Sequence, residues 1–317
     1  MYETNNEWYF IVNPRAGSGK TMSEWVPAEK KLDRLGIKYV TEFTDYKKHA
    51  TALAYEAAAN GYRKILAVGG DGSLHETISG IMKWCDENKV SPTEFRLGVA
   101  PIGSGNDWIK SLNVPHDVSQ VIDLINNESF GEMDVVRVRS VGGRNSYMAN
   151  CGGVGFDSHV CKRVNMLKER GYRSKMIYLN ALRHTALSLR AINVQVLADG
   201  KEVYSGQTLS IAIGNGRYSG SGMRQVPLAD NNDGEIDVMI VPRIPLTKIF
   251  KQIPKLFNGT LDESKDVIFA RCKCLEIIPL DSNSQDIIEL DGEIEGRLPI
   301  TVTVGEDKIN VIKGRVS

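Results

Sequence analysis

Three glycine-rich loops carry side chains that could bind and transfer phosphate. They are Asn13–Lys20 (NPRAGSGK), Gly69–Ser73 (GGDGS) and Pro101–Asp107 (PIGSGND). Each loop follows a short apolar run and precedes a helical pattern. Glycines at such places let backbone N–H groups approach phosphate oxygens, and the N-terminus of a helix favours an anion. The three loops therefore indicate a phosphate-binding surface.

Two charged side chains in these loops refine that interpretation. Lys20 supplies a positive point charge for phosphate oxygens. Asp71 would repel phosphates unless Mg²⁺ or a hydroxyl proton lay between them. Taken singly, each loop could be a plain turn, and Asp71 could simply cap the helix that follows it. Three such loops in succession are harder to explain as turns alone.

Two common nucleotide motifs are excluded by single positions. A P-loop needs glycine where Pro14 stands, so the first loop is not a Walker A motif. The third loop lacks the last glycine of the dinucleotide fingerprint, because Trp108 and Ile109 follow it. A nicotinamide-binding site is therefore disfavoured.

A later segment, Pro227–Asp237, is rich in acidic residues. Asp230, Asp233, Glu235 and Asp237 precede an apolar run, and such hard oxygen ligands suit Mg²⁺ or Ca²⁺. A solvated acidic turn is the alternative. The spacing excludes an EF-hand, because no glutamate stands at the twelfth position.

Near the end of the chain, Glu289–Glu295 has the pattern of a strand, an Asp-Gly turn and a second strand. Considered alone, it predicts a type I′ hairpin rather than a catalytic motif.

The elements that must position these loops follow from periodicity. Apolar runs predict strands at residues 8–12, 37–43, 64–68 and 97–101. Helical patterns cover residues 23–35, 49–60, 74–82 and the stretch ending at Leu112. Strands that alternate with helices predict parallel βαβ units, so ligands should bind at the carboxyl ends of the strands, where the glycine loops lie.

From about Asp134 the pattern changes to strands and turns. Strands are predicted at residues 193–197, 202–204, 209–213, 236–241, 275–278, 287–290 and 300–304, with a hairpin turn at Asp199-Gly200. We therefore predict an α/β fold with two domains: residues 1–130 form a nucleotide-binding domain with a parallel sheet, and residues 131–317 form a mostly antiparallel β-domain. The last residues could pack back on the first domain.

Composition excludes several classes of protein. The chain has 317 residues, 42% of them hydrophobic, and equal numbers of basic and acidic residues, 39 each, so no global field favours nucleic acid. Its five cysteines lack paired spacing, which disfavours zinc sites and disulfides and favours the cytoplasm. The sequence contains no apolar run of membrane-spanning length, so a protein that is neither secreted nor transmembrane is expected.

In these motifs and their order, the sequence resembles the diacylglycerol kinase catalytic-domain family, which includes bacterial lipid kinases, sphingosine kinases and ceramide kinases. The three glycine loops match the family's nucleotide loops, and further similar blocks occur at residues 150–155, 214–223 and 227–238. The resemblance implies a nucleotide-binding α/β domain similar to NAD kinase and a β-sandwich lipid domain. It also implies an ATP-dependent kinase whose acceptor is a lipid hydroxyl, diacylglycerol or a related alcohol.

The resemblance also implies roles for individual residues. Nucleotide contacts are expected from Asn13, Ser18, Gly19, Lys20, Thr44, Gly69, Gly70, Asp71, Gly72, Ser73, Leu74, His75, Gly103, Ser104 and Asn106. Ser73 and Ser104 stand where the family commonly has threonine, and both keep the hydroxyl. His75 stands where many relatives have asparagine.

The implied catalytic groups are acidic. Asp71 would act with the phosphates and Mg²⁺, and Glu293 would be the base that takes the proton of the attacking hydroxyl. The Asp233 carboxylate and main-chain oxygens of Asp230 and Glu235 would hold a metal ion. Asp107 and Asp134 would belong to the same polar network.

Between residues 158 and 190 the chain is locally basic. This segment contains eight lysines and arginines but a single acid, Glu169, and apolar residues lie among them. The basic residues are Lys162, Arg163, Lys168, Arg170, Arg173, Lys175, Arg183 and Arg190. This composition suits transient contact with an anionic membrane, which would place the protein at the inner face of the membrane. An ordinary solvated helix pair is the alternative. Nucleic acid is a poorer partner, because aromatic residues are few there.

Other functions share some of these features. NAD kinase and phosphofructokinase-like enzymes also carry a Gly-Gly-Asp-Gly loop, but residues 13–20 and 214–223 favour the lipid kinases. A non-enzymatic nucleotide sensor or lipid-binding module would bind ATP without turnover, yet Lys20, Asp71, Asp233 and Glu293 are all present. A homodimer is common in such folds. The residues do not identify which lipid is phosphorylated.

Overall fold

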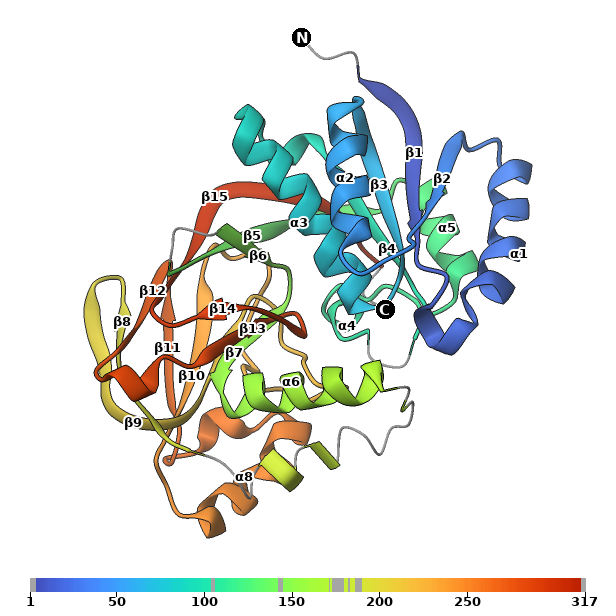
Figure 1. Cartoon of the computed structure of the whole chain (residues 1–317). Coiled ribbons are helices and arrows are strands. Elements are labelled where there is room, and N and C mark those ends of the chain that lie inside the picture. Colours follow the sequence, from blue (N-terminus) through green and yellow to red (C-terminus); the bar gives the residue numbers. More distant parts are fainter. Residues whose placement is uncertain are drawn as a thin grey trace. The chain divides into compact units, whose positions relative to one another are not determined.

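The computed structural model describes residues 4–103, 106–141, 145–170, 172, 180–181, 183–185 and 190–314. The chain divides into two compact units, one formed by residues 1–135 together with 306–317 and the other by residues 136–305. Figure 1 labels their elements.

The first unit alternates strands and helices from its N-terminus. Its strands are β1 (Asn5–Val12), β2 (Tyr39–Phe43), β3 (Tyr62–Gly69) and β4 (Arg96–Pro101). Its helices are α1 (Thr21–Arg34), α2 (His49–Ala59), α3 (Asp71–Asn88), α4 (Trp108–Ser111) and α5 (Val118–Asn126). The predicted βαβ pattern is confirmed, but α3 continues six residues beyond the predicted helix 74–82, and α5 was not predicted.

These strands form the predicted parallel sheet. β1 lies between β2 and β3, β3 pairs with β4, and Asn310 at the end of β15 (Ile300–Ile312) pairs in parallel with Arg96 of β4. Ile65, Leu66 and Val68 of β3 are fully buried, as expected for a central strand covered on both faces. Because the strands are parallel, their carboxyl ends lie at one edge of the sheet.

The second unit is built mainly from antiparallel strands. They are β6 (Asn145–Met148), β7 (Cys151–Gly155), β8 (Ile192–Ala198), β9 (Lys201–Gly214), β10 (Ile236–Pro242), β11 (Ile268–Cys272), β12 (Cys274–Pro279), β13 (Ile287–Leu290) and β14 (Glu293–Arg297). β5 (Phe130–Ser140) enters from the first unit, and β15 leaves toward it. The unit also contains helices α6 (Phe156–Glu169) and α8 (Leu246–Asn258).

One predicted break in this unit is wrong. Residues 202–204 and 209–213 were expected to be separate strands, but both belong to the continuous strand β9. The polar residues between them mark a change of partner: β9 pairs with β8 as far as Thr208 and with β7 and β10 beyond it. The predicted Asp199-Gly200 turn is confirmed, since both residues have positive φ, 50° and 75°.

The core of the second unit comes from the inward faces of these strands. β8 alternates in burial, with Val194 and Val196 fully buried and their neighbours partly exposed. Ile213, Val238 and Leu275 join the same cluster. This is the two-residue periodicity expected for strands with one face on a core.

Candidate functional site

The three glycine loops lie together in the first unit. Asn13, directly after β1, donates from Nδ2 to Oγ of Ser73 at 3.2 Å, which joins the first loop to the second. The backbone N–H of Ile102 donates to the carbonyl of Gly69 at 2.8 Å, which joins the second loop to the third. The loops therefore converge at the carboxyl ends of β1, β3 and β4, as the sequence predicted.

At two positions in these loops, neighbouring atoms lie too close to leave room for a Cβ, so glycine is required. A Cβ on Gly69 would collide with the side chain of Ser73, and a Cβ on Gly17 would lie 2.7 Å from Cγ2 of Ile102. Gly17 also has a φ of 56°, which L side chains rarely adopt. Side chains at these positions would push the loops apart.

Asp71 connects two helix starts rather than capping its own helix. Gly70 is the N-cap of α3, and Asp71 is the first helical residue. Its Oδ2 accepts the backbone N–H of Asp107 at 2.8 Å, and its Oδ1 accepts that of Trp108 at 3.4 Å. The carboxylate therefore fixes the third loop against the second.

The other predicted nucleotide residues fall in the same region. Thr44 is buried next to β1, and its N–H donates to the carbonyl of Val12 at 2.9 Å. Ser73, Leu74 and His75 are buried in the first turns of α3. Lys20 is exposed at the start of α1. The side chain of Ser18 and all of Ser104 lie outside the described residues.

The third loop is held by its own amide. Nδ2 of Asn106 donates to the carbonyl of Gly103 at 3.2 Å, and Asn106 has a φ of 45°. Gly103 also has a positive φ, 144°, and glycine and asparagine are the residues that tolerate such values best.

Each of the two acids assigned to a polar network faces a lysine that the sequence analysis did not single out. Asp107, 4% exposed, has its Oδ1 2.5 Å from Nζ of Lys110. Asp134, 0% exposed, has its Oδ1 3.3 Å from Nζ of Lys308. Buried carboxylates need such a partner. Membership of one shared network stays a prediction.

Asp71 is the acid of these loops that would serve a divalent ion arriving with a nucleotide. Such an ion usually binds one or two protein carboxylates together with phosphate oxygens and water. Asp107 is less suited to this role, because its Oδ1 lies 2.5 Å from Nζ of Lys110 and that ammonium group would repel a divalent ion. The Asp71 carboxylate would supply hard oxygen donors, and the ion would neutralise charge on the phosphates.

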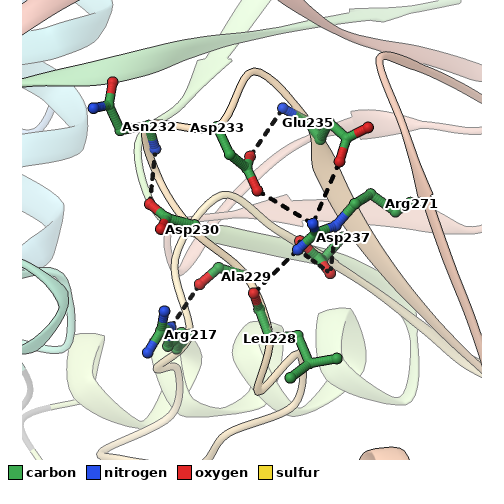
Figure 2. Close-up of polar contacts among 9 residues, drawn as sticks. All are labelled: Arg217, Leu228, Ala229, Asp230, Asn232, Asp233, Glu235, Asp237 and Arg271. Atoms are coloured by element: carbon green, nitrogen blue, oxygen red, sulfur yellow. Dashed lines mark hydrogen bonds and ion pairs between the residues drawn. The ribbon is translucent and has the colours of Figure 1, made fainter.

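The acidic loop of the second unit gathers around an arginine, as Figure 2 shows. Nη1 of Arg271 lies 3.4 Å from both Oδ2 of Asp233 and Oε2 of Glu235. Nη2 of Arg271 lies 3.2 Å from Oδ2 of Asp237 and donates to the carbonyl of Leu228 at 3.2 Å. Asp237 and Arg271 stand directly opposite each other on β10 and β11. One guanidinium thus faces three carboxylates.

The electrostatics of this cluster follow from that contact. Hydrogen bonding to Asp237 raises the pKa of Arg271, so the guanidinium stays charged. Burial raises the pKa of Asp237, and the hydrogen bond and charge of Arg271 partly offset that effect.

The Asp233 carboxylate is engaged by other groups of this cluster, and the predicted metal site at Asp233 and the main-chain oxygens of Asp230 and Glu235 stays a prediction. The other oxygen of Asp233, Oδ1, accepts the N–H of Glu235 at 3.1 Å, and Oδ1 of Asp230 accepts that of Asn232 at 3.2 Å. A divalent ion bound to Oδ2 of Asp233 would lie within about 6 Å of the guanidinium and would be repelled by it. In the described part of the chain, no group of three or more His, Cys, Asp and Glu is arranged to hold a metal.

Glu293 begins β14 in the second unit, directly after the predicted turn. Asp291 and Gly292 have φ values of 50° and 89°, and Leu290 pairs with Glu293 across the turn. The predicted type I′ hairpin is therefore confirmed. Glu293 itself is partly exposed.

The basic segment 158–190 is described only in part. Lys162, Arg163 and Lys168 lie on α6, and Lys162 and Lys168 are exposed. Arg173 and Lys175 lie outside the described residues. Contact with a membrane therefore stays a prediction. In the described residues, no helix is long and apolar enough to cross a bilayer.

Comparison with known families gives two matches that together span most of the chain. Residues 7–138 match the diacylglycerol kinase catalytic domain, and residues 152–313 match the YegS C-terminal NAD kinase beta sandwich-like domain. The first match covers most of the N-terminal segment of the first unit, and the second covers most of the second unit together with part of the C-terminal segment that belongs to the first unit.

Individual proteins agree with these family matches. A diacylglycerol kinase of Mycobacterium tuberculosis is 24% identical over 306 residues, covering 96% of this chain and 94% of that protein. A diacylglycerol kinase of Staphylococcus aureus is 25% identical over 302 residues, covering 95% and 90%. The crystal structure of a putative diacylglycerol kinase from Bacillus anthracis has the same fold, with a TM-score of 0.76 at 21% identity and 97% coverage of both chains. The chain therefore belongs to the diacylglycerol kinase catalytic-domain family and is a phosphotransferase.

Proposed function

We propose that this chain transfers the γ-phosphoryl group of ATP to the hydroxyl of a lipid alcohol, with diacylglycerol or a close relative as the acceptor. The observation that carries the proposal is the convergence of three glycine loops at one edge of a parallel sheet, joined by the Asn13–Ser73 and Ile102–Gly69 hydrogen bonds. The names of the relatives favour diacylglycerol among lipid alcohols.

In this proposal the first unit binds the magnesium complex of ATP. Backbone N–H groups of the loops and of the first turn of α3 bind phosphate oxygens, and Lys20 adds a positive charge. Asp71 holds the third loop in place and offers carboxylate oxygens to the nucleotide's Mg²⁺. Phosphoryl transfer depends mainly on positioning and on neutralising charge, so these groups would supply most of the rate enhancement.

In the second unit, Glu293 would act as the general base. Its carboxylate would accept the proton of the lipid hydroxyl while the hydroxyl oxygen forms a bond to the γ-phosphorus and the bond to the ADP oxygen breaks. No covalent intermediate on the protein is needed. The acceptor would be reached from the cytoplasm at an anionic membrane surface by transient contact. Either a monomer or a homodimer could act in this way.

The test is an assay of the purified full chain with γ-labelled ATP, Mg²⁺ and a panel of acceptors. The panel contains diacylglycerol, monoacylglycerol, phosphatidylglycerol, a sphingoid base, ceramide and, as the arm for the alternative small-molecule kinase, NAD. We expect label in a lipid product, with diacylglycerol best. Label in NADP alone would exclude the lipid assignment, and tight ATP binding without transfer to any acceptor would exclude the kinase assignment.

Two variants and a matched control test the residue roles. Glu293→Gln and Asp71→Asn should each lower kcat by at least about 100-fold. Glu295→Gln is the control, because Glu295 is the other glutamate of β14 and carries no proposed catalytic role. It should retain activity. Wild-type kcat in Glu293→Gln would remove the base assignment.

A further inference from the structure

The turn that precedes Glu293 is held by contacts that a hairpin does not need. A type I′ turn requires only two residues with positive φ, and the Asp291-Gly292 pair meets that requirement by itself. Yet both residues are bonded to segments outside the hairpin. Because Glu293 is the first residue of β14, whatever fixes the turn also fixes the Cα of Glu293.

The Asp291 carboxylate binds one side of this turn to the loop before β7. Oδ2 accepts the N–H of Ala149 at 2.8 Å, and Oδ1 accepts those of Asn150 and Cys151 at 2.8 and 3.1 Å. The N–H of Asp291 donates in return to the carbonyl of Cys151 at 2.7 Å. Hydrogen bonds to a carboxylate are stronger than neutral ones, so four bonds make this a firm attachment.

The loop that Asp291 binds is itself anchored. The carbonyl of Asn150 accepts N–H groups of Asn215 and Gly216 at 2.8 and 2.9 Å, and Nδ2 of Asn150 donates to the carbonyl of Tyr218 at 2.7 Å. Asp291 therefore bonds to a segment that is already held by the loop following β9. A fixed anchor is what positioning requires.

The other side of the turn is bonded to α6. The carbonyl of Gly292 accepts Sγ–H of Cys161 at 2.9 Å and Nδ2 of Asn165 at 2.9 Å. The N–H of Gly292 donates to Oε2 of Glu289 at 2.9 Å. The turn is thus fixed on two sides. The Asp291 carboxylate bonds it to the loop before β7, and Asn165 bonds it to helix α6.

We propose that Asp291 and Asn165 are positioning residues for the general base: they hold the turn so that the Glu293 carboxylate meets the acceptor hydroxyl. This inference rests on the proposed function. A base must lie within hydrogen-bond reach of the proton it takes, and a displacement of about 1 Å can cost about 100-fold in rate. The two residues act on kcat through Glu293, whereas the nucleotide loops lie in the other unit.

The chain offers a matched control for this proposal. Asp199-Gly200 is a second Asp-Gly turn with φ values of 50° and 75°, and Oδ1 of Asp199 accepts N–H groups of Lys273 and Cys274 at 3.0 and 2.9 Å. It has the same chemistry but precedes no proposed catalytic residue. In both turns an Asp→Asn substitution keeps a residue that type I′ geometry favours and removes only the charge and one acceptor oxygen.

The experiment compares Asp291→Asn, Asp199→Asn, Asn165→Ala and Glu293→Gln in the full chain. We expect Asp291→Asn and Asn165→Ala to lower kcat by about 10- to 100-fold with the KM for ATP unchanged. Asp199→Asn should keep the wild-type kcat even if its melting temperature falls as much as that of Asp291→Asn. Glu293→Gln should be the least active, and combining it with Asp291→Asn should add no further loss.

The outcomes separate this inference from the proposed function. If Glu293→Gln is inactive but Asp291→Asn and Asn165→Ala have wild-type kcat, the positioning role is overturned while the base assignment stands. If both Asp→Asn variants lose kcat in proportion to their loss of melting temperature, the role of Asp291 is only structural. If Glu293→Gln is fully active, the base assignment itself fails. Should Asp291→Asn melt below the assay temperature, a wild-type kcat in Asn165→Ala alone would overturn the proposal.

Discussion

Arg271 and Asp233 form an ion pair in which Nη1 of the arginine lies 3.4 Å from Oδ2 of the aspartate. The same guanidinium faces Glu235 and Asp237. The acidic loop therefore carries its own counter-charge, and that charge is part of the chain.

Removing this guanidinium should make the loop depend on an added cation. In Arg271→Gln the three carboxylates repel one another, and we expect the unfolding free energy to fall by about 1 kcal/mol, a modest figure because the arginine side chain is 40% exposed. Mg²⁺ should restore part of the melting temperature in this variant. The wild-type melting temperature should be the same in EDTA and in Mg²⁺ without nucleotide. Arg271→Lys keeps the charge but not the two-nitrogen contact, so it should lose less stability than Arg271→Gln. A wild-type protein that melts several degrees lower in EDTA would show that a metal ion, rather than Arg271, holds the loop.

The Lys308–Asp134 pair predicts a large loss of stability. Asp134 is fully buried, so Lys308→Met would remove a positive charge from beside a buried carboxylate. We expect a loss of about 3 kcal/mol, measured by denaturant unfolding. The double variant Asp134→Asn with Lys308→Met should recover most of it, because the buried charge is then gone. Equal stability of the single and double variants would argue against a charge effect.

Asp157 predicts a pH dependence in the second unit. Although the residue is partly exposed, burial of its carboxyl group raises its pKa, and hydrogen bonds from Ser210 and Gln225 at 2.7 and 2.8 Å only partly offset this. A carboxyl with a raised pKa binds a proton more readily in the folded state than in the unfolded state. Its contribution to stability therefore increases as pH falls from neutral toward that pKa.

Thermal melts between neutral and mildly acidic pH check this sign. The melting temperature of the wild type minus that of Asp157→Asn should increase as pH falls, because the variant has no proton to take up at this position. Asp199→Asn serves as the control, since it makes the same change of side chain in an exposed turn. A difference that stays constant or shrinks toward acid would contradict the prediction.

The parts of the fold that could be predicted are those whose sequence pattern lies within a few neighbouring residues. β1, β3 and β4 are apolar runs followed directly by glycine loops, so both the strands and their functional ends could be identified from neighbouring residues. The Asp291-Gly292 turn could also be predicted from neighbouring residues, because the dipeptide itself favours type I′ geometry.

The features that could not be predicted depend on contacts between residues that are far apart in the sequence. Arg271 faces Asp237 only because β10 and β11 pair in that register, and nothing near either residue indicates the other. Lys308 and Asn165 likewise reach their partners from far along the chain. Residues 205–208 of β9 are polar and lie between the two predicted strands, whereas pairing with β8 keeps this stretch extended.

The path of β15 has a consequence for how the protein is made. Asn310 and Val311 are the partners of Arg96 and Leu97 at the margin of the parallel sheet. After β4 has been synthesised, the ribosome adds some two hundred residues before the end of β15 exists. Until then, one edge of β4 has unpaired N–H and C=O groups. The N-terminal unit can therefore reach its final form only after Asn310 and Val311 have been synthesised, which leaves an interval in which a chaperone could bind the nascent chain.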